Sequence, residues 1–225
     1  SKCSDKMSLM CYYVQVLDWL LGGDWMPKET FLNLPKSKQA VIDDILLQTF
    51  CAQSISQVKV SQIVDQMGMS RGAFYKYFDD LEDAYRYIIK KHSLIIHQDI
   101  LAYIQEFQSD FFKGIERYLL WCSALNTSDA YWKALKLLIS SEYGRTMKRI
   151  EMDETNSMMK QWLTILRYNQ FQIVSTAEAS SFLYFMMELV MGSLSDFIVN
   201  DWTSEALLED YHYKVKWLVH GVVAR

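Results

Sequence analysis

The sequence predicts an all-α fold in which a three-helix N-terminal domain precedes a larger helical domain. Both prolines, Pro27 and Pro35, precede residue 36, so no later residue carries the ring that breaks a helix. Only eight glycines occur. Apolar residues recur at the helical spacing of three and four positions, whereas the alternation typical of strands is scarce. Everything after residue 35 can therefore be helical.

The composition is that of a folded protein in a reducing compartment. Hydrophobic residues make up 51% and charged residues 22% of the chain, which is enough apolar surface to offset the entropy lost on folding. The longest apolar run, Phe182 to Met191, is interrupted by Glu188 and is shorter than the roughly 20 residues that span a bilayer. We expect a cytoplasmic protein without a membrane-spanning segment, in which Cys51 and Cys122 are small buried apolar groups.

Residues 1–35 are interpreted as an N-terminal extension. Met7 to Leu21 is apolar enough for a short helix ending at Gly22. A basic start followed by this run resembles a secretion signal, but no small-residue cleavage site follows. We also hypothesise that translation naturally begins at Met26, because the Gly-Gly-Asp sequence just before it can be encoded by a purine-rich ribosome-binding site.

The three-helix domain is predicted to cover residues 36–82, and its first helix runs from Lys36 to Gln53. One face of that helix is apolar and is expected to be buried, with Val41, Ile42, Ile45, Leu46, Thr49 and Phe50. A polar link leads to a short second helix, Val60 to Met67. Gly68 ends it, because glycine enters the left-handed conformation without a steric cost.

The third helix is predicted from Arg71 to Phe78, with Ser70 as its N-cap. Phe74 and Phe78 lie four positions apart on one side of this helix and are expected to face the core. The opposite side is polar, aromatic and basic. Two short helices joined by a tight glycine-containing turn make a helix-turn-helix unit, whose second helix is the candidate for the major groove of DNA.

The run from Val60 to Phe78, followed by Leu81-Glu82-Asp83, resembles the DNA-binding region of the TetR family of bacterial transcription regulators, and the resemblance covers the region between residues 36 and 91. It implies that Arg71 and Gly72 lie against base edges and that Tyr75 and Tyr77 bind phosphates, contacts that these side chains can make. The full set of predicted DNA-binding residues is Lys59, Ser61, Gln62, Ser70, Arg71, Gly72, Ala73, Tyr75, Lys76 and Tyr77.

The sequence departs from this family at Ala73, where a hydroxyl donor is usual, at Val60, where threonine is common, and at residues 79–81, which normally include a lysine. Asp80 and Asp83 are interpreted as a capping pair for the next helix, the alternative being a switch role. Residues 36–91 carry eight Lys and Arg against seven Asp and Glu, a net charge of +1. Non-specific DNA affinity should therefore be low.

Residues 83–225 are predicted to form a helical effector-binding and dimerisation domain. A long helix from Leu81 to about Ile104 would connect it to the helix-turn-helix. Further helices are expected at residues 110–125, 128–140, 144–167, 175–200 and 204–223. The last two are long and amphipathic and carry small residues that allow close helix approach. We expect them to form a homodimer, whose twofold symmetry suits a palindromic operator.

Large apolar side chains are concentrated between residues 107 and 187. Most are expected to be core, since aromatic and methionine side chains at helical spacing usually are. A cavity for an apolar or aromatic small-molecule effector is nevertheless expected between these helices. The candidate ligand-binding residues are Phe112, Tyr118, Trp121, Trp132, Met158 and Trp162.

The sequence carries no convincing catalytic motif. Ser56 and Lys59 match a Ser-x-x-Lys hydrolase string, but its companion motifs are missing. The four histidines and four cysteines lack metal-binding spacing, so we predict no catalytic residue, metal or cofactor. The predicted function is a ligand-responsive repressor that binds a palindromic operator as a homodimer. The alternative is an interaction protein of the same fold that acts through another regulator.

Overall fold

The computed structural model describes residues 27–107, 109–141, 149, 153, 155 and 157–222, and every regular element within them is a helix. The all-α prediction is thereby confirmed. The predicted helix at residues 7–21 and the hypothesised start at Met26 lie outside the described residues. The described residues divide into two compact units, the first made of 27–95 with 127–141 and 149, and the second of 96–126 with the described residues after 150.

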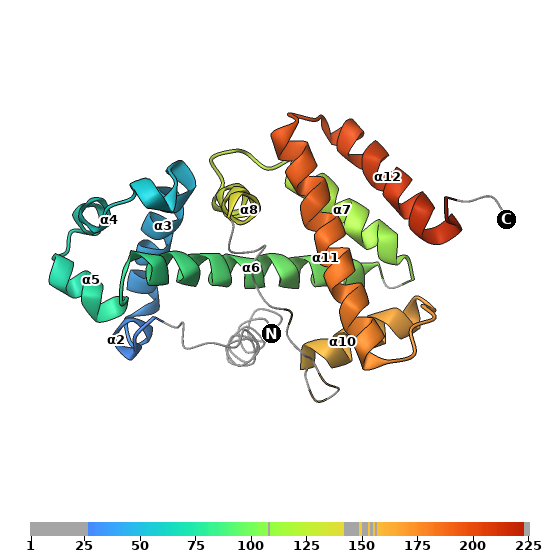
Figure 1. Cartoon of the computed structure of the whole chain (residues 1–225), viewed down its shortest axis with the longest axis horizontal. Helices are drawn as coiled ribbons and strands as arrows, with labels where there is room; N and C mark the ends of the chain where they lie inside the picture. Colours follow the sequence, from blue (N-terminus) through green and yellow to red (C-terminus); the bar gives the residue numbers. More distant parts are fainter. Residues whose placement is uncertain are drawn as a thin grey trace. The chain divides into compact units, whose positions relative to one another are not determined.

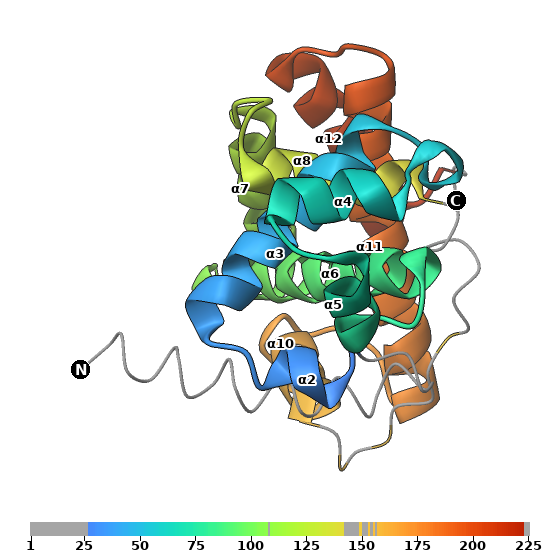
Figure 2. The ribbon, with the colours of Figure 1, turned by 90° about the vertical axis from the view of Figure 1, so that its left-hand side faces the viewer.

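The first unit contains the helix-turn-helix. Its elements are α2 (Glu29–Leu32), α3 (Lys36–Ala52), η1 (Ile55–Gln57), α4 (Val60–Met67), α5 (Arg71–Tyr77), the first part of α6 (Leu81–Glu106) and α8 (Ala130–Ser140). Helix α4 packs against α3 and α5, and α2 lies against α5 (Figure 2). Helix α8 was expected to belong to the effector domain, but it packs along α3.

The second unit is built from the remainder of α6 with α7 (Phe111–Ser123), α10 (Ser157–Tyr168), α11 (Thr176–Val199) and α12 (Ser204–His220). Helix α7 packs against both α11 and α12, and α10 packs against α11. The two C-terminal helices run side by side (Figure 1). Of the helix predicted at residues 144–167, the structure describes the part from residue 157 onward as α10.

Side-chain caps explain why several helices begin where the sequence predicted. The Asp110 carboxylate accepts a hydrogen bond from the Lys113 N–H at 3.0 Å. The Ser175 hydroxyl accepts from the Glu178 N–H at 3.1 Å. Each cap satisfies a backbone donor that the first turn of a helix leaves without a partner.

The buried face of α3 differs from the predicted one. Val41 was expected to be buried, which is wrong, because its side chain is 58% exposed. The core positions of α3 are instead Gln39, Ile42, Asp43, Leu46, Leu47, Thr49 and Phe50. This face is rotated away from Val41 because α3 packs against both α4 and α8. The contact with α8 was not predicted.

Residues 27–34 belong to the first unit. The side chain of Phe31 is fully buried and its ring contacts those of Tyr77, Phe78 and Tyr87, with ring centroids 5.2 to 5.9 Å apart. The buried Gln39 side chain donates hydrogen bonds to the carbonyl oxygens of Leu32 and Leu34, both at 2.9 Å. The segment that we interpreted as the end of an extension is thus part of the helix-turn-helix core.

Helix α11 is the one described helix that is long and apolar enough to cross a membrane by length and composition alone. The core helix of a globular unit passes the same test, and Leu183, Met186, Val190 and Leu194 of α11 are buried in the second unit. Its apolar character therefore has an explanation within the fold.

Candidate nucleic-acid interface

The turn between α4 and α5 has the geometry that its residues favour. Gly68 adopts the left-handed conformation, with φ of 61°. The Met69 N–H donates to the Val64 carbonyl at 3.0 Å and the Gly68 N–H to the Asp65 carbonyl at 3.2 Å, the pattern of a Schellman motif. The Ser70 hydroxyl then accepts from the Ala73 N–H at 3.2 Å and caps α5. The predicted turn and cap are confirmed.

The inner side of α5 fixes the helix to the core. Phe74 and Phe78 are fully buried. Their rings lie 5.5 Å apart, and Phe78 also contacts Tyr87 of α6 at 5.7 Å. Because aromatic rings carry large buried area, these contacts define which face of α5 points outward.

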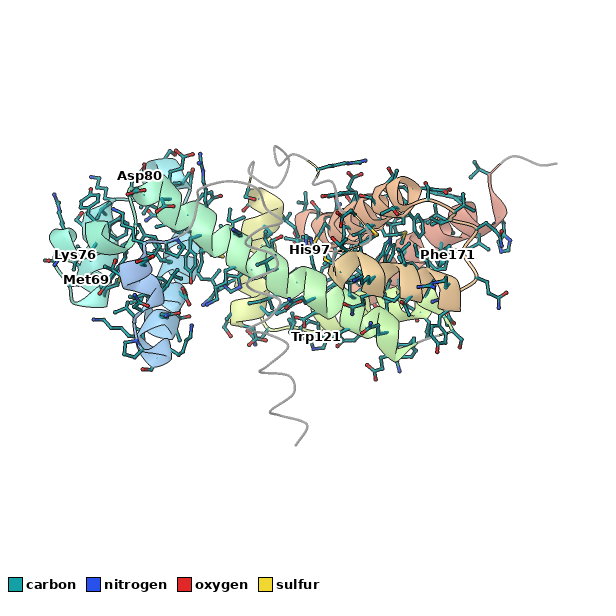
Figure 3. All side chains as sticks on the ribbon, turned by 90° about the horizontal axis from the view of Figure 1, so that it is seen from below. Met69, Lys76, Asp80, His97, Trp121 and Phe171 are labelled. Atoms are coloured by element: carbon teal, nitrogen blue, oxygen red, sulfur yellow. The ribbon has the colours of Figure 1, made fainter. Side chains whose placement is uncertain are left out.

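The outer side of α5 and the start of α4 are accessible. The exposed members of the predicted DNA-binding set are Lys59, Gln62, Ser70, Arg71, Gly72, Tyr75 and Lys76, whereas Ser61, Ala73 and Tyr77 are half-buried. Figure 3 shows Lys76 and Met69 at the outer edge of this unit. The fold therefore leaves most of the predicted residues accessible on two neighbouring helices.

The basic residues of this surface have no carboxylate partner within the part of the chain that the structure describes. Lys59, Arg71 and Lys76 form no ion pair there. Guanidinium and ammonium groups without an ion-pair partner can donate hydrogen bonds to base edges or phosphates without first breaking a salt bridge.

Besides Ser70, which caps α5, two of the predicted residues have a structural task. The Gln62 side-chain oxygen accepts from the Lys59 N–H at 2.8 Å, which caps the first turn of α4. The Tyr77 ring packs edge-on against Phe31. Substituting either would disturb the fold as well as the surface, so neither is the best test of DNA contact.

Gly72 is not required by the protein's own packing. A Cβ atom built at this position meets only the Ser70 hydroxyl oxygen, at 3.8 Å, and the backbone angle is not of the left-handed kind. A side chain would fit in the unbound protein. A glycine here therefore suits close approach by an external molecule.

The acidic corner after α5 is a helix cap. The Asp83 N–H donates to the Asp80 carboxylate at 2.8 Å and the Asp79 N–H donates to the Asp83 carboxylate at 3.0 Å. Burial raises the pKa of Asp83, and the hydrogen bond from Asp79 offsets only part of that shift. The predicted Asp80–Asp83 capping pair is confirmed, and Asp80 lies at the start of α6 (Figure 3).

Two residues that contact the C-terminal end of α5 were not predicted from the sequence. The Lys28 ammonium donates to the Tyr75 carbonyl at 2.9 Å and lies 2.7 Å from the Asp79 carboxylate. The Thr30 hydroxyl donates to the Lys76 carbonyl. No periodic pattern marks Lys28 or Thr30, since their partners lie more than forty residues away in the sequence.

Four of the predicted effector residues lie in two ring clusters of the second unit. Tyr118 and Trp121 belong to a ring cluster with Tyr103. Around Phe111 a second cluster includes Phe112, Trp162, Phe171 and Phe182. Trp121 and Phe171 are drawn in separate parts of the second unit in Figure 3, and Trp132 lies on α8 in the first unit.

Burial separates these candidates further. Tyr118 and Trp162 are fully buried, and the Trp162 indole N–H donates to the Ala179 carbonyl at 2.8 Å. These two side chains are part of the core. Phe112, Trp121 and Met158 are half-buried and remain the better candidates for contact with a small molecule.

Comparison with known proteins agrees with this architecture. Residues 110–222, half of the chain, match the family model described as Tetracyclin repressor-like, C-terminal domain. The chain is also similar to the solved structure of a TetR family transcriptional regulator from Pectobacterium atrosepticum, with 11% sequence identity, a TM-score of 0.53, and 84% of this chain and 96% of that chain covered. A TetR family transcriptional regulator from Chloroflexus aurantiacus shares 19% identity over 86% of this chain and 91% of that chain, with a TM-score of 0.41. No curated protein matches the chain.

An all-helical fold with an exposed helix-turn-helix defines the class as a DNA-binding regulator. Because the family model covers half of the sequence, the chain belongs to the TetR family of transcription regulators. Members of this family are generally not enzymes. Within the described residues, no group of three or more His, Cys, Asp or Glu side chains is placed to hold a metal ion.

Proposed function

We propose that this protein is a cytoplasmic, ligand-responsive repressor that binds a palindromic operator as a homodimer. The observation that carries the proposal is the two-sided nature of α5. Phe74 and Phe78 are fully buried, while Gly72 and Lys76 on the opposite side of the helix and Arg71 at its N-terminal end are exposed. A short basic helix whose inner side packs on the core and whose outer side is accessible is suited to bind in the major groove of DNA.

Homodimerisation is supported by apolar surface on the two C-terminal helices. The exposed large apolar residues there are Phe185, Val199, Tyr213, Trp217, Leu218 and Val219. A Cβ atom built at Gly192 of α11 meets no atom within 4 Å, so this glycine leaves room for close approach by a second copy. Two copies related by a twofold axis would present two α5 helices to half-sites about 34 Å apart.

The proposed effector is apolar or aromatic and binds in the second unit near Phe112 or Trp121. Aromatic and apolar side chains dominate this unit, as they do in most small-molecule sites. Helix α6 continues from the second unit into the first and offers a route from effector to DNA. A coupling free energy of about 1 to 3 kcal/mol between the two sites would be sufficient for regulation.

The first experiment measures DNA binding by fluorescence anisotropy across a salt series. The DNA is taken from upstream of the gene and from duplexes that the protein selects out of a random pool, with scrambled duplexes for comparison. We expect preferential binding that weakens as salt rises, because phosphate contacts release counterions. Equal, feeble binding to all duplexes would reject the proposal and favour the interaction protein that acts through another regulator.

Two substitutions test whether the exposed side of α5 contacts DNA. Arg71→Ala should lower affinity for the selected duplex more than for scrambled DNA, since one bidentate base contact is worth roughly 1 to 3 kcal/mol of discrimination. Gly72→Ala should lower it by steric exclusion, although the unbound protein accommodates the methyl group. Arg167→Ala, at an exposed position of α10, is the matched control. Equal losses for both DNAs would exclude base reading by Arg71.

A further inference from the structure

We infer that Lys28 neutralises the charge of Asp79 at the C-terminal end of α5, and that this ion pair allows that end of the helix to lie beside a row of DNA phosphates. The inference deepens the proposed function and rests on it, because it concerns how α5 enters a duplex. Lys28 would thus be a positioning residue for DNA binding that lies outside α4 and α5, the two helices of the helix-turn-helix.

The position of the Lys28 ammonium is set by the fold. Its nitrogen lies 2.7 Å from Asp79 and 2.9 Å from the Tyr75 carbonyl oxygen. The backbone N–H of the same residue donates to the Tyr77 carbonyl at 2.9 Å. Phe31, three residues further on, is fully buried. Lys28 is therefore held at the last turn of α5 by both its main chain and its side chain.

Asp79 lies where phosphates would pass. A helix of seven residues such as α5 is about 10 Å long, and the major groove is about 12 Å wide. A helix that crosses the groove consequently has each end near one of the two phosphate rows. The Asp79 side chain, two residues after the end of α5, is 77% exposed. Without a counter-charge its carboxylate would repel that row.

The local charge balance shows what Lys28 contributes. Among the accessible charged side chains at this end of α5, Lys28 and Lys76 balance Asp79 and Asp80, and without Lys28 their sum is −1. The buried Asp83 carboxylate lies beside them and adds to the acidic character of this corner. The Lys28 side chain is 39% exposed, and a solvated pair of this kind adds little to folding stability. Its effect should appear in DNA affinity rather than in the melting temperature.

The test is a double-mutant cycle on the duplex selected by the wild-type protein. Lys28→Met removes the charge, keeps the chain length and should weaken binding about five- to tenfold at moderate salt, with a salt slope shallower by about 1. Adding Asp79→Asn to Lys28→Met restores the local charge. The double variant should regain most of the affinity and the wild-type salt slope.

Control measurements distinguish an effect of charge on DNA binding from an effect on folding. Thermal melting should be similar for all four proteins. Lys38→Met removes an exposed lysine at the start of α3, and its cycle with Asp79→Asn should show no coupling. If the double variant binds as weakly as Lys28→Met, or if Lys28→Met binds like the wild type, the inference is overturned. A wild-type protein without DNA preference would overturn the proposed function along with it.

Discussion

Gly114 is the residue whose lack of a side chain matters most to the second unit. A Cβ atom built there would lie 2.6 Å from the Ile104 Cα and 2.8 Å from the Tyr103 carbonyl oxygen. Both neighbours are backbone atoms of α6 and cannot turn aside as a flexible side chain would. The close approach of α7 to α6 therefore leaves no room for a side chain at this position.

Gly114→Ala should therefore destabilise the protein. Forcing one methyl group into this contact moves the two helices apart, which typically costs about 1 to 3 kcal/mol of unfolding free energy. Urea unfolding followed by circular dichroism measures the change. Gly72→Ala is the matched control, since its added methyl group meets only one side-chain atom. Equal stabilities of the two variants would contradict the close approach seen here.

Asp43 is a buried carboxylate that joins α3 to α6. It accepts a hydrogen bond from the Tyr87 hydroxyl at 2.8 Å and forms an ion pair with Lys91. Burial, together with the nearby charge of Asp43, raises the pKa of Tyr87, so the hydroxyl remains a protonated donor. The contact joins residues more than forty positions apart in the chain.

Asp43→Ala should lower the unfolding free energy by about 1.5 to 3 kcal/mol, the usual range for hydrogen bonds to a charged group. Asp44→Ala changes the same residue type one position along, where the side chain is exposed, and should have a small effect. Chemical denaturation of both variants gives the comparison. Similar losses in both would mean that Asp43 is not the link between α3 and α6.

At the scale of elements, α6 carries two histidines that resist protonation. Burial lowers the pKa of His92 to about 4, with the charge of Lys91 adding to the shift and Asp43 opposing it. Burial likewise lowers the pKa of His97 to about 4. In the unfolded chain a histidine titrates near 6.5. Between these two values the unfolded state binds more protons than the folded state.

The unfolding free energy should therefore fall as pH decreases from about 6.5 to about 4, with no further loss from these groups below that. The double variant with His92→Gln and His97→Gln should lose less stability over the same window. Urea unfolding at several pH values compares the two slopes, and carboxylate titration is common to both proteins. Identical slopes would show that the histidines are not responsible.

The helix boundaries were largely predictable because their signals are local. Ser70, Asp80, Asp110 and Ser175 each accept a backbone hydrogen bond from the residue three positions further on. Such caps act within one helical turn, so the sequence shows them directly. Helix α2 was missed because its four residues are too few for a periodic pattern.

At the scale of the whole molecule, the exposed apolar surface of α12 should govern assembly. Val219 on α12 is 54% exposed, and we expect it to be covered by a second copy. Val219→Asp should shift the protein towards monomers, since a charge placed in an apolar interface is costly to bury. Sedimentation velocity or light scattering over a concentration series measures the change.

The first unit offers a matched control. Val41 has nearly the same exposure, 58%, but lies on α3. Val41→Asp should leave the oligomeric state unchanged. A wild-type protein that is monomeric at all concentrations, or equal effects of the two substitutions, would reject the C-terminal helices as the dimer interface.

The sequence by itself determined the helical class, the helix-turn-helix with its glycine turn and serine cap, and the outer face of α5. These features follow from periodicity, capping and backbone freedom, which operate over a few neighbouring residues. For the same reason the resemblance to the TetR family could be recognised in the short sequence from Val60 to Phe78.

Only the tertiary structure decided how distant segments meet. It packed α8 along α3 and left Val41 exposed, and it placed four of the predicted effector residues in two aromatic clusters. It also brought Lys28 to Asp79, fifty-one positions apart in the sequence. Such pairings depend on chain topology and on the fit of whole helix faces, and no local pattern of residues carries that information.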